Sequence, residues 1–187
     1  LKELRKVQKF CQTKIKMSQK NNITGHNGPY NSPIKLPGKK VLKSWIDYNG
    51  HMNVAFYTMA IDKSLDVFLE NTLGLGETHA KQNDQGPFVV QASFHYLNEM
   101  KYNDRFFVQA TLIDFDTKKM HLCLEIISEE KHMIMAISEQ LMLNVNLIKR
   151  KTETYPNWAI KRLTLMKENH KKIKLPQNIG RKILIKK

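Results

Sequence analysis

The residues best suited to chemistry form one short cluster, residues 47–53, with the sequence Asp-Tyr-Asn-Gly-His-Met-Asn. Asn-Gly is a strong turn signal, and the apolar run that follows over residues 54–73 has helical spacing. A carboxylate (Asp47), a glycine that permits close approach (Gly50) and an imidazole (His51) would therefore lie where a helix presents unpaired N–H groups. Those N–H groups and the helix dipole favour negative charge that develops during a reaction.

The helix over residues 54–73 must position this cluster. Asn53 is expected to be its N-cap, because the side-chain oxygen can accept an orphan backbone N–H, and Gly74 and Gly76 suit its C-terminal end. Apolar residues cover most of its circumference, and only one stripe is firmly polar: Asp62, Lys63, Asp66 and Glu70. We therefore expect other elements to pack on several sides of this helix.

Four runs after the helix alternate apolar and polar residues with period two, as half-buried strands do. They cover residues 88–96, 106–112, 120–126 and 133–145. Short connections predict antiparallel pairing of consecutive strands, hence an α+β fold in which an antiparallel sheet curls around the helix. A second helix is predicted over residues 156–171, with Pro156 in its first turn.

The two ends of the chain suggest a simple domain organisation. We expect residues 1–32 to be a basic N-terminal extension or linker, or the remnant of an upstream domain, and residues 33–187 to be one folded domain with a core that begins near Val41. Residues 21–40 are rich in Gly and Pro and are predicted to form a loop.

Cys11 and Cys123 suggest no disulfide framework, and no spacing of metal ligands is present, so we expect a cytoplasmic location, no metal and no cofactor.

The net charge of +14 admits three kinds of partner: nucleic acid, an anionic membrane surface or an anionic metabolite. Nearly all of the positive charge is Lys rather than Arg, which is what an AT-rich genome would produce, whereas nucleic-acid readers more often use Arg. No nucleic-acid reader motif is present and no apolar run is long enough to cross a membrane. We therefore expect neither partner, and a nucleic-acid binder is the least supported alternative.

Residues 47–53, followed by Phe56-Tyr57, resemble the D-x-N-G-H-M-N signature of hotdog-fold thioesterases related to 4-hydroxybenzoyl-CoA thioesterase. The likeness spans roughly residues 33–185 and includes residues 73–76, 96–99, 114–119 and 139–143. This set is similar to the betainyl-CoA thioesterases of carnitine breakdown, which occur as separate proteins or fused behind an L-carnitine dehydrogenase. The resemblance implies a hotdog fold, in which an antiparallel sheet wraps a long central helix and a C-terminal helix follows.

The resemblance also implies hydrolysis of acyl-CoA thioesters. Asp47 would act as general base on water or as nucleophile, and the thioester carbonyl would lie against backbone N–H groups near Gly50. His51 would be catalytic or orienting, with a loop-packing hydrogen bond as the alternative. Asn53 would be a cap or a further catalytic group, and Met52 would contact substrate.

Further candidates would complete a pocket in a homodimer or homotetramer. Gln91 and Ser93 project from the polar face of the first long strand and would contact substrate, unless they are ordinary polar strand residues. Tyr48 would contact substrate, and a trimethylammonium group could be caged by four aromatic residues: Trp45, Tyr48, Phe56 and Tyr57. The alternative for Phe56 and Tyr57, which we favour, is packing in the core. The CoA phosphates could meet a basic set, which otherwise is a solvated surface: Lys118, Lys119, Lys149 and Arg150.

Two short segments depart from the family pattern. Gln91-Ala92-Ser93 stands where relatives often have Glu-x-His, and Asn144-Val145-Asn146 stands where they often have His-Val-Asp. These departures motivate an alternative function: a non-catalytic acyl-CoA-binding hotdog module, or an accessory domain of a carnitine or 3-hydroxyacyl-type dehydrogenase.

Overall fold

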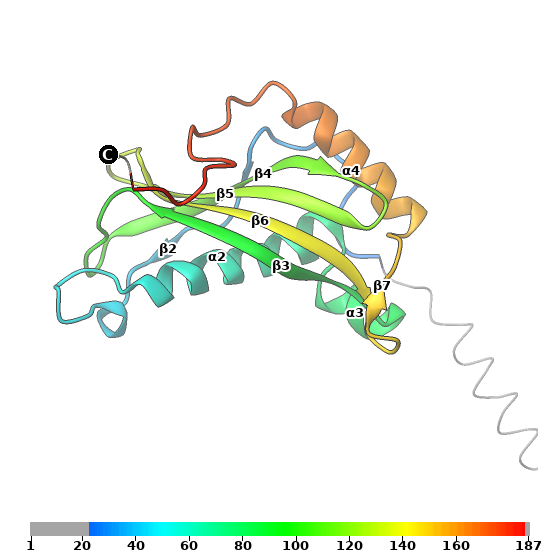
Figure 1. Cartoon of the computed structure of the whole chain (residues 1–187), viewed down its shortest axis with the longest axis horizontal. Helices are drawn as coiled ribbons and strands as arrows, with labels where there is room; N and C mark the ends of the chain where they lie inside the picture. The colour runs from blue at the N-terminus through cyan, green and yellow to red at the C-terminus, as the bar shows by residue number, and fades with distance from the viewer. Residues whose placement is uncertain (1–22, 186–187) are drawn as a thin grey trace, which may run out of the picture.

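A computed structural model describes residues 23–185, and one antiparallel sheet curves around a long helix in it (Figure 1). The hotdog architecture is therefore confirmed. The long strands are β3 (Gln85–Tyr96), β4 (Arg105–Phe115), β5 (Lys119–Ser128) and β6 (Ile134–Asn146), and the short ones are β1 (Ile34–Lys35), β2 (Lys39–Lys40) and β7 (Lys151–Thr152). The helices are α2 (Val54–Phe68), α3 (Glu77–Asn83) and α4 (Asn157–His170), with a 3-10 turn at Lys43–Trp45.

Helix α2 confirms the predicted central helix. It continues without a break into a π-helical turn, Leu69–Leu73, and ends at Gly74, which has the left-handed φ of 75°. Asn53 is the N-cap, as predicted, because its side chain accepts a hydrogen bond from the Ala55 N–H. The apolar side chains of α2 face the inner side of the sheet, where burial of large aliphatic and aromatic groups stabilises the wrapped arrangement.

The strand order differs from the prediction at one point. β4, β5 and β6 pair consecutively and antiparallel, but β3 pairs with β6 and not with β4. The connection over residues 97–104 is long enough to cross the end of the sheet, and the 13-residue β6 offers a full-length partner to the 12-residue β3. β4 pairs on its other side with β1 and β2, in the segment predicted to be a loop. β3 is therefore an edge strand of the described sheet.

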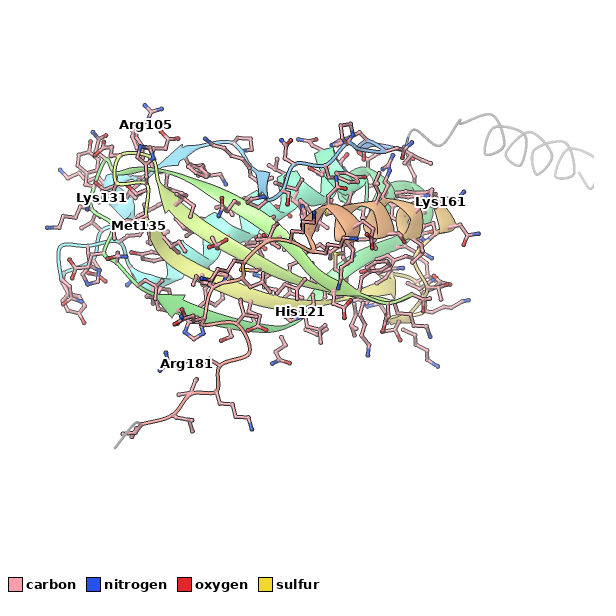
Figure 2. All side chains as sticks on the ribbon, turned by 90° about the horizontal axis from the view of Figure 1, so that it is seen from above. Arg105, His121, Lys131, Met135, Lys161 and Arg181 are labelled. Carbon is pink, nitrogen blue, oxygen red and sulfur yellow. The ribbon has the colours of Figure 1, made fainter. Side chains whose placement is uncertain are left out.

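The sheet has an inner face against α2 and an outer face. Alternate residues of β5 show the division: Leu122 and Leu124 are part of the core cluster, whereas Cys123 and Glu125 point the other way and are also buried. The segment that follows α4, red in Figure 1, lies over this outer face. There the Gly180 N–H donates to the Glu139 carboxylate over 2.7 Å, and Figure 2 shows the segment carrying Arg181 towards the β3 edge.

Helix α4 confirms the predicted C-terminal helix and ties down the segment before β1. The buried Arg162 donates to the carbonyls of Thr24 and Leu73 over 2.7 Å each, and Tyr30 is buried in the core. The expectation of a core that begins near Val41 is therefore wrong, because α4 supplies the partners that order the preceding Gly/Pro-rich stretch. Residues 1–22 lie outside the described residues, so the domain boundary at residue 32 stays a prediction.

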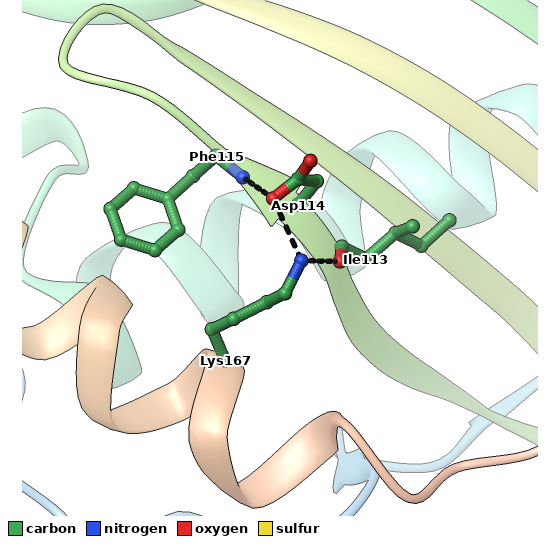
Figure 3. Close-up of polar contacts among 4 residues, drawn as sticks. All are labelled: Ile113, Asp114, Phe115 and Lys167. Atoms are coloured by element: carbon green, nitrogen blue, oxygen red, sulfur yellow. Dashed lines mark hydrogen bonds and ion pairs between the residues drawn. The ribbon is translucent and has the colours of Figure 1, made fainter.

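Lys167 fixes the other end of α4 to the sheet. Its ammonium group donates to the Ile113 carbonyl and to the Asp114 carboxylate, the latter over 2.7 Å (Figure 3). This bond lowers the pKa of the Asp114 carboxyl, and the Phe115 N–H lowers it further. Because Asp114 is largely exposed, solvent screening keeps the contribution of the ion pair small.

Residues 23–185 contain neither a membrane-spanning helix nor a cluster of metal ligands. No helix there combines the length and the apolarity needed to cross a lipid bilayer. No group of three or more His, Cys, Asp or Glu side chains there is arranged to hold a metal ion. Cys123 is a buried thiol whose pKa burial raises to about 12; Cys11 lies outside the described residues.

Gly74 is expected to tolerate no side chain. A Cβ there would approach the Thr24 carbonyl oxygen to 2.1 Å, in addition to the cost of a left-handed φ, whereas a Cβ on Gly180, also left-handed, would meet nothing within 4 Å. In urea unfolding, Gly180→Ala should lower the free energy of unfolding by at most about 1–2 kcal/mol. Gly74→Ala should lower it by about 2 kcal/mol more, at the upper end of single-mutant effects. Equal losses would contradict the close packing of Thr24 on Gly74.

Because His170 is buried, we expect the free energy of unfolding to fall in mild acid. Its Nδ1 accepts from the Leu112 N–H over 2.9 Å and its Nε2 lies 2.8 Å from the Asn31 carbonyl oxygen, which fixes the neutral imidazole with Nε2–H as donor. Burial lowers the pKa of His170, although the Asn31 carbonyl opposes the shift. The unfolded imidazole therefore takes up a proton before the folded one, so stability is full above about pH 6.5 and is lost as pH falls below it.

The measurement is urea unfolding at several pH values between about 4.5 and 7.5, and His170→Gln should flatten the dependence. A variant that keeps the full wild-type slope would contradict the assignment to His170.

Candidate active site at the start of helix α2

The loop of residues 46–53, called here the Asp47 loop, folds back on itself before α2. Ile46 and Met52 form an isolated antiparallel bridge, and the Asp47 N–H donates to the His51 carbonyl over 3.1 Å. The Gly50 N–H donates to the Asp47 carbonyl over 3.0 Å, and Gly50 has a φ of 78°, which favours glycine. The turn predicted from Asn-Gly thus brings Asp47 back beside the helix start.

The Asp47 carboxylate is half-buried and held by two donors. One oxygen accepts from the Asn49 N–H over 2.8 Å, and the other accepts from the Asn53 side-chain amide over 3.1 Å. The oxygen of that same Asn53 amide caps α2 by accepting from the Ala55 N–H over 3.0 Å. Asn53 therefore links the carboxylate directly to the first turn of the helix.

A free backbone donor follows Asn53 directly in the chain. The N–H of Val54, the first residue of α2, has no hydrogen-bond acceptor among the described residues, and Val54 is 54% exposed. An N–H at a helix N-terminus is a preformed site for negative charge. A carboxylate and such a donor together can activate water and stabilise the oxyanion of an acyl-transfer reaction.

A hollow of about 330 Å³ opens beside the same helix start, and we call it the helix-start hollow. Its lining comes from the Asp47 loop, from α2 and from the end of β3: His51, Met52, Val54, Tyr57, Tyr96, Leu97, Asn98 and Glu99. Its floor is rigid, because the Tyr57 hydroxyl accepts from the Met100 N–H over 3.1 Å and donates to the Asn98 carbonyl over 3.3 Å. His51 Nδ1 lies 3.2 Å from the Met52 carbonyl oxygen.

Sequence reasoning named His51 and Met52 but did not assign the other wall of this hollow to the site. That wall is residues 96–99 at the end of β3, and their only signal was the family likeness of the same residues. Nothing in their spacing indicated that the end of β3 would meet the helix start, because the pairing of β3 with β6 was not predicted.

Three other predicted site residues do not line the helix-start hollow. Tyr48 is 96% exposed. Gln91 and Ser93 line a separate hollow of about 650 Å³ on the outer face of the sheet, together with His121, Glu139 and Arg181. Within one chain, the structure does not bring Gln91 and Ser93 to the helix-start hollow.

The four rings do not form a shared cage within one chain, and the packing of Tyr57 and Phe56 agrees with the alternative of core packing for these two residues. Trp45 stacks on Phe56 with ring centres 5.5 Å apart, Tyr57 is buried, and Tyr48 extends into solvent. Because Trp45 and Phe56 stack face to face, no cavity for a cation lies between their rings. The predicted phosphate-binding set, Lys118, Lys119, Lys149 and Arg150, is exposed.

The departure at Asn144 and Asn146 has a structural explanation. The Asn144 side-chain amide donates to the carbonyls of Glu153 and Thr154 over 3.1 and 3.2 Å, and the Asn146 amide donates to the Glu153 carboxylate over 2.9 Å. Both side chains therefore fasten β6 to the segment that leads into α4. Asn144 and Asn146 stand where relatives often have His and Asp. The contacts of the two Asn side chains lie at this junction and not at the Asp47 loop.

Comparisons with known proteins agree with this geometry. A Pseudomonas aeruginosa betainyl-CoA thioesterase is 27% identical over 143 residues, which cover 76% of this chain and 89% of that one. An L-carnitine dehydrogenase/betainyl-CoA thioesterase of Rhizobium meliloti is 26% identical over 151 residues, which cover 81% of this chain but only 30% of the fused protein.

The similarity extends to three dimensions and to a family model. A Staphylococcus aureus protein solved in complex with CoA aligns with a TM-score of 0.75 at 22% identity, covering 85% of this chain and 100% of that one, a likeness that shows the fold. The model of the thioesterase-like superfamily matches residues 41–168, which include the Asp47 loop, α2 and all four long strands. Since that match covers well over half of the sequence, the chain belongs to the thioesterase-like superfamily.

Proposed function

We infer that the chain is an acyl-CoA thioesterase, and we propose that it acts on a short acyl-CoA such as betainyl-CoA through Asp47. One observation carries the proposal: the Asp47 carboxylate is tied by Asn53 to a helix start with an unpaired N–H and an adjacent hollow. The relatives named betainyl-CoA thioesterase support the acyl group.

Two routes of hydrolysis suit this arrangement. As a general base, Asp47 takes a proton from water, the water oxygen bonds to the thioester carbon, and the carbonyl oxygen gains negative charge beside the Val54 N–H. The C–S bond then breaks and CoA leaves as its thiol. As a nucleophile, Asp47 bonds to the carbon itself and expels CoA, and water then cleaves the mixed anhydride.

We also propose that the chain works as a homodimer built on the β3 edge. β3 pairs only with β6 in the described sheet, and its exposed apolar residues Phe88, Val89 and Val90 leave a strand edge suited to another strand. Pairing through this edge would bring Gln91 and Ser93 of one protomer towards its partner, which is how they would contact substrate. Tetramers and association with a dehydrogenase are extensions of this proposal, the latter supported by the fused relatives.

Replacing the proposed catalytic carboxylate tests the function. Asp47→Asn keeps the size and hydrogen-bonding shape of the side chain but removes its basicity, so kcat for CoA-thiol release should fall by about 100-fold or more. Asp62→Asn, the same change on the polar stripe of α2, should leave kcat unchanged. Full activity of Asp47→Asn would exclude Asp47. A wild-type protein that binds acyl-CoAs stoichiometrically but releases no thiol from any of them would favour the non-catalytic module.

Asn53 offers a test that separates folding from catalysis. Asn53→Ser keeps an acceptor for the Ala55 N–H without adding a charge beside Asp47, so stability should stay within a few tenths of a kcal/mol, whereas Asn53→Ala should lose about 1 kcal/mol. Both variants lose the amide that donates to Asp47, so kcat should fall by about 10-fold or more in each, with a smaller change in KM. If Asn53→Ser were as active as wild type, the amide would be a cap alone.

A further inference from the structure

The charges that line the helix-start hollow differ in sign from the net charge of the chain, which is +14. No Lys or Arg lines the hollow, and Glu99 is the one carboxylate among its lining residues. Burial raises the pKa of the Tyr57 hydroxyl at its floor, and the nearby carboxylates of Glu99 and Asp104 raise it further. The hollow therefore lies in a locally negative field within a positive protein.

Two aromatic rings form a corner in this hollow. Tyr57 and Tyr96 meet edge to face, with ring centres 5.3 Å apart and planes at 74°. Phe94 stacks behind Tyr96 at 6.1 Å with nearly parallel planes, which supports the outer wall. The hydrogen bonds of the Tyr57 hydroxyl fix the inner wall. The corner therefore consists of the half-exposed ring of Tyr96, the mostly buried ring of Tyr57 as its inner wall, and Glu99, all of which line the same hollow.

We propose that this corner, formed by Tyr57, Tyr96 and Glu99, binds the quaternary ammonium group of the acyl chain. The inference rests on the proposed thioesterase function and adds the basis of its substrate choice. A quaternary ammonium ion has no N–H to donate, so it needs π faces and diffuse negative charge, not a set of hydrogen-bond acceptors. A hollow of about 330 Å³ is near the lower limit for ligand sites and suits a short head group.

The position of the corner also fits the reaction. His51 and Val54 line the same hollow, and Val54 carries the free N–H proposed to receive the carbonyl oxygen. In a betainyl group a single methylene separates the ammonium nitrogen from the thioester carbonyl carbon. A head group held against Tyr57 and Tyr96 would therefore leave its carbonyl near Val54 at the helix start, to which Asn53 ties the Asp47 carboxylate.

The test compares two substrates of the same shape, of which only one is charged. Because the ammonium group also makes the adjacent carbonyl more electrophilic, the readout is the change that a variant makes in the ratio of the two kcat/KM values. Betainyl-CoA and 3,3-dimethylbutyryl-CoA have the same shape, with nitrogen replaced by carbon in the latter. Wild type should prefer betainyl-CoA in kcat/KM. Glu99→Gln should lower kcat/KM for betainyl-CoA by about 3–10-fold, the range that a partly exposed cation site supports, and leave the neutral substrate unchanged. Glu77→Gln in α3, beyond the far end of α2, is the matched control and should change neither.

Tyr96→Leu provides a second variant, since this half-exposed ring can be replaced with the fold retained, as circular dichroism would verify. It should reduce the preference for betainyl-CoA by about 3-fold or more. Equal loss for both substrates in Glu99→Gln and Tyr96→Leu, or no preference in wild type, would overturn the proposal while leaving thioesterase activity intact.

Binding separates this inference from the proposed function. The two acyl groups can be presented as ketones, with a methylene inserted between the carbonyl carbon and the CoA sulfur, so that no hydrolysis occurs. In titration calorimetry, wild type should bind the cationic ketone more tightly than the neutral one. Glu99→Gln should show a smaller difference in affinity between the two ketones. That result would hold even if no thiol were released. Equal affinity for the two ketones in wild type would contradict the cation site.

Discussion

One side-chain amide connects the elements on which the proposed chemistry depends. Asn53 accepts from the first turn of α2 through its oxygen and donates to the Asp47 carboxylate through its nitrogen. The carboxylate therefore cannot move independently of the helix whose N–H is proposed to receive the oxyanion. Preorganised donors and bases need no reorientation during the reaction, which is where such sites gain most of their rate. The half-buried position of Asp47 leaves it reachable by water and substrate.

The fold supplies the rigidity behind this link. α2 is wrapped on its apolar side by the inner face of the sheet, and its far end is closed by Gly74 against Thr24 and Arg162. At its near end, the Met52 N–H donates to the Met100 carbonyl over 2.7 Å, which attaches the Asp47 loop to the β3–β4 connection. That connection also builds the helix-start hollow. The loop, the helix start and the end of β3 thus form one rigid corner.

Local sequence signals were sufficient for the long elements but not for the short elements β1, β2 and α3, nor for the pairing of the strands. The helix, its Asn53 cap, the four long strands and α4 followed from periodicity and capping chemistry, because these depend on neighbours in sequence. The β3–β6 pairing did not, since it depends on contacts about 50 residues apart along the chain, as in Ser93 opposite Glu139. The family likeness identified residues 47–53, but the contact between Tyr57 and Tyr96 was not predicted, because the two rings are far apart in sequence.

The most direct test of the central claim is a crystal structure of the inactive Asp47→Asn protein with bound betainyl-CoA. The thioester carbonyl oxygen is predicted to lie within hydrogen-bond distance of the Val54 N–H, with its carbon next to the residue 47 side chain. A thioester bound instead in the outer-face hollow beside Gln91 and Ser93, remote from any start of α2 in the assembly, would contradict the account.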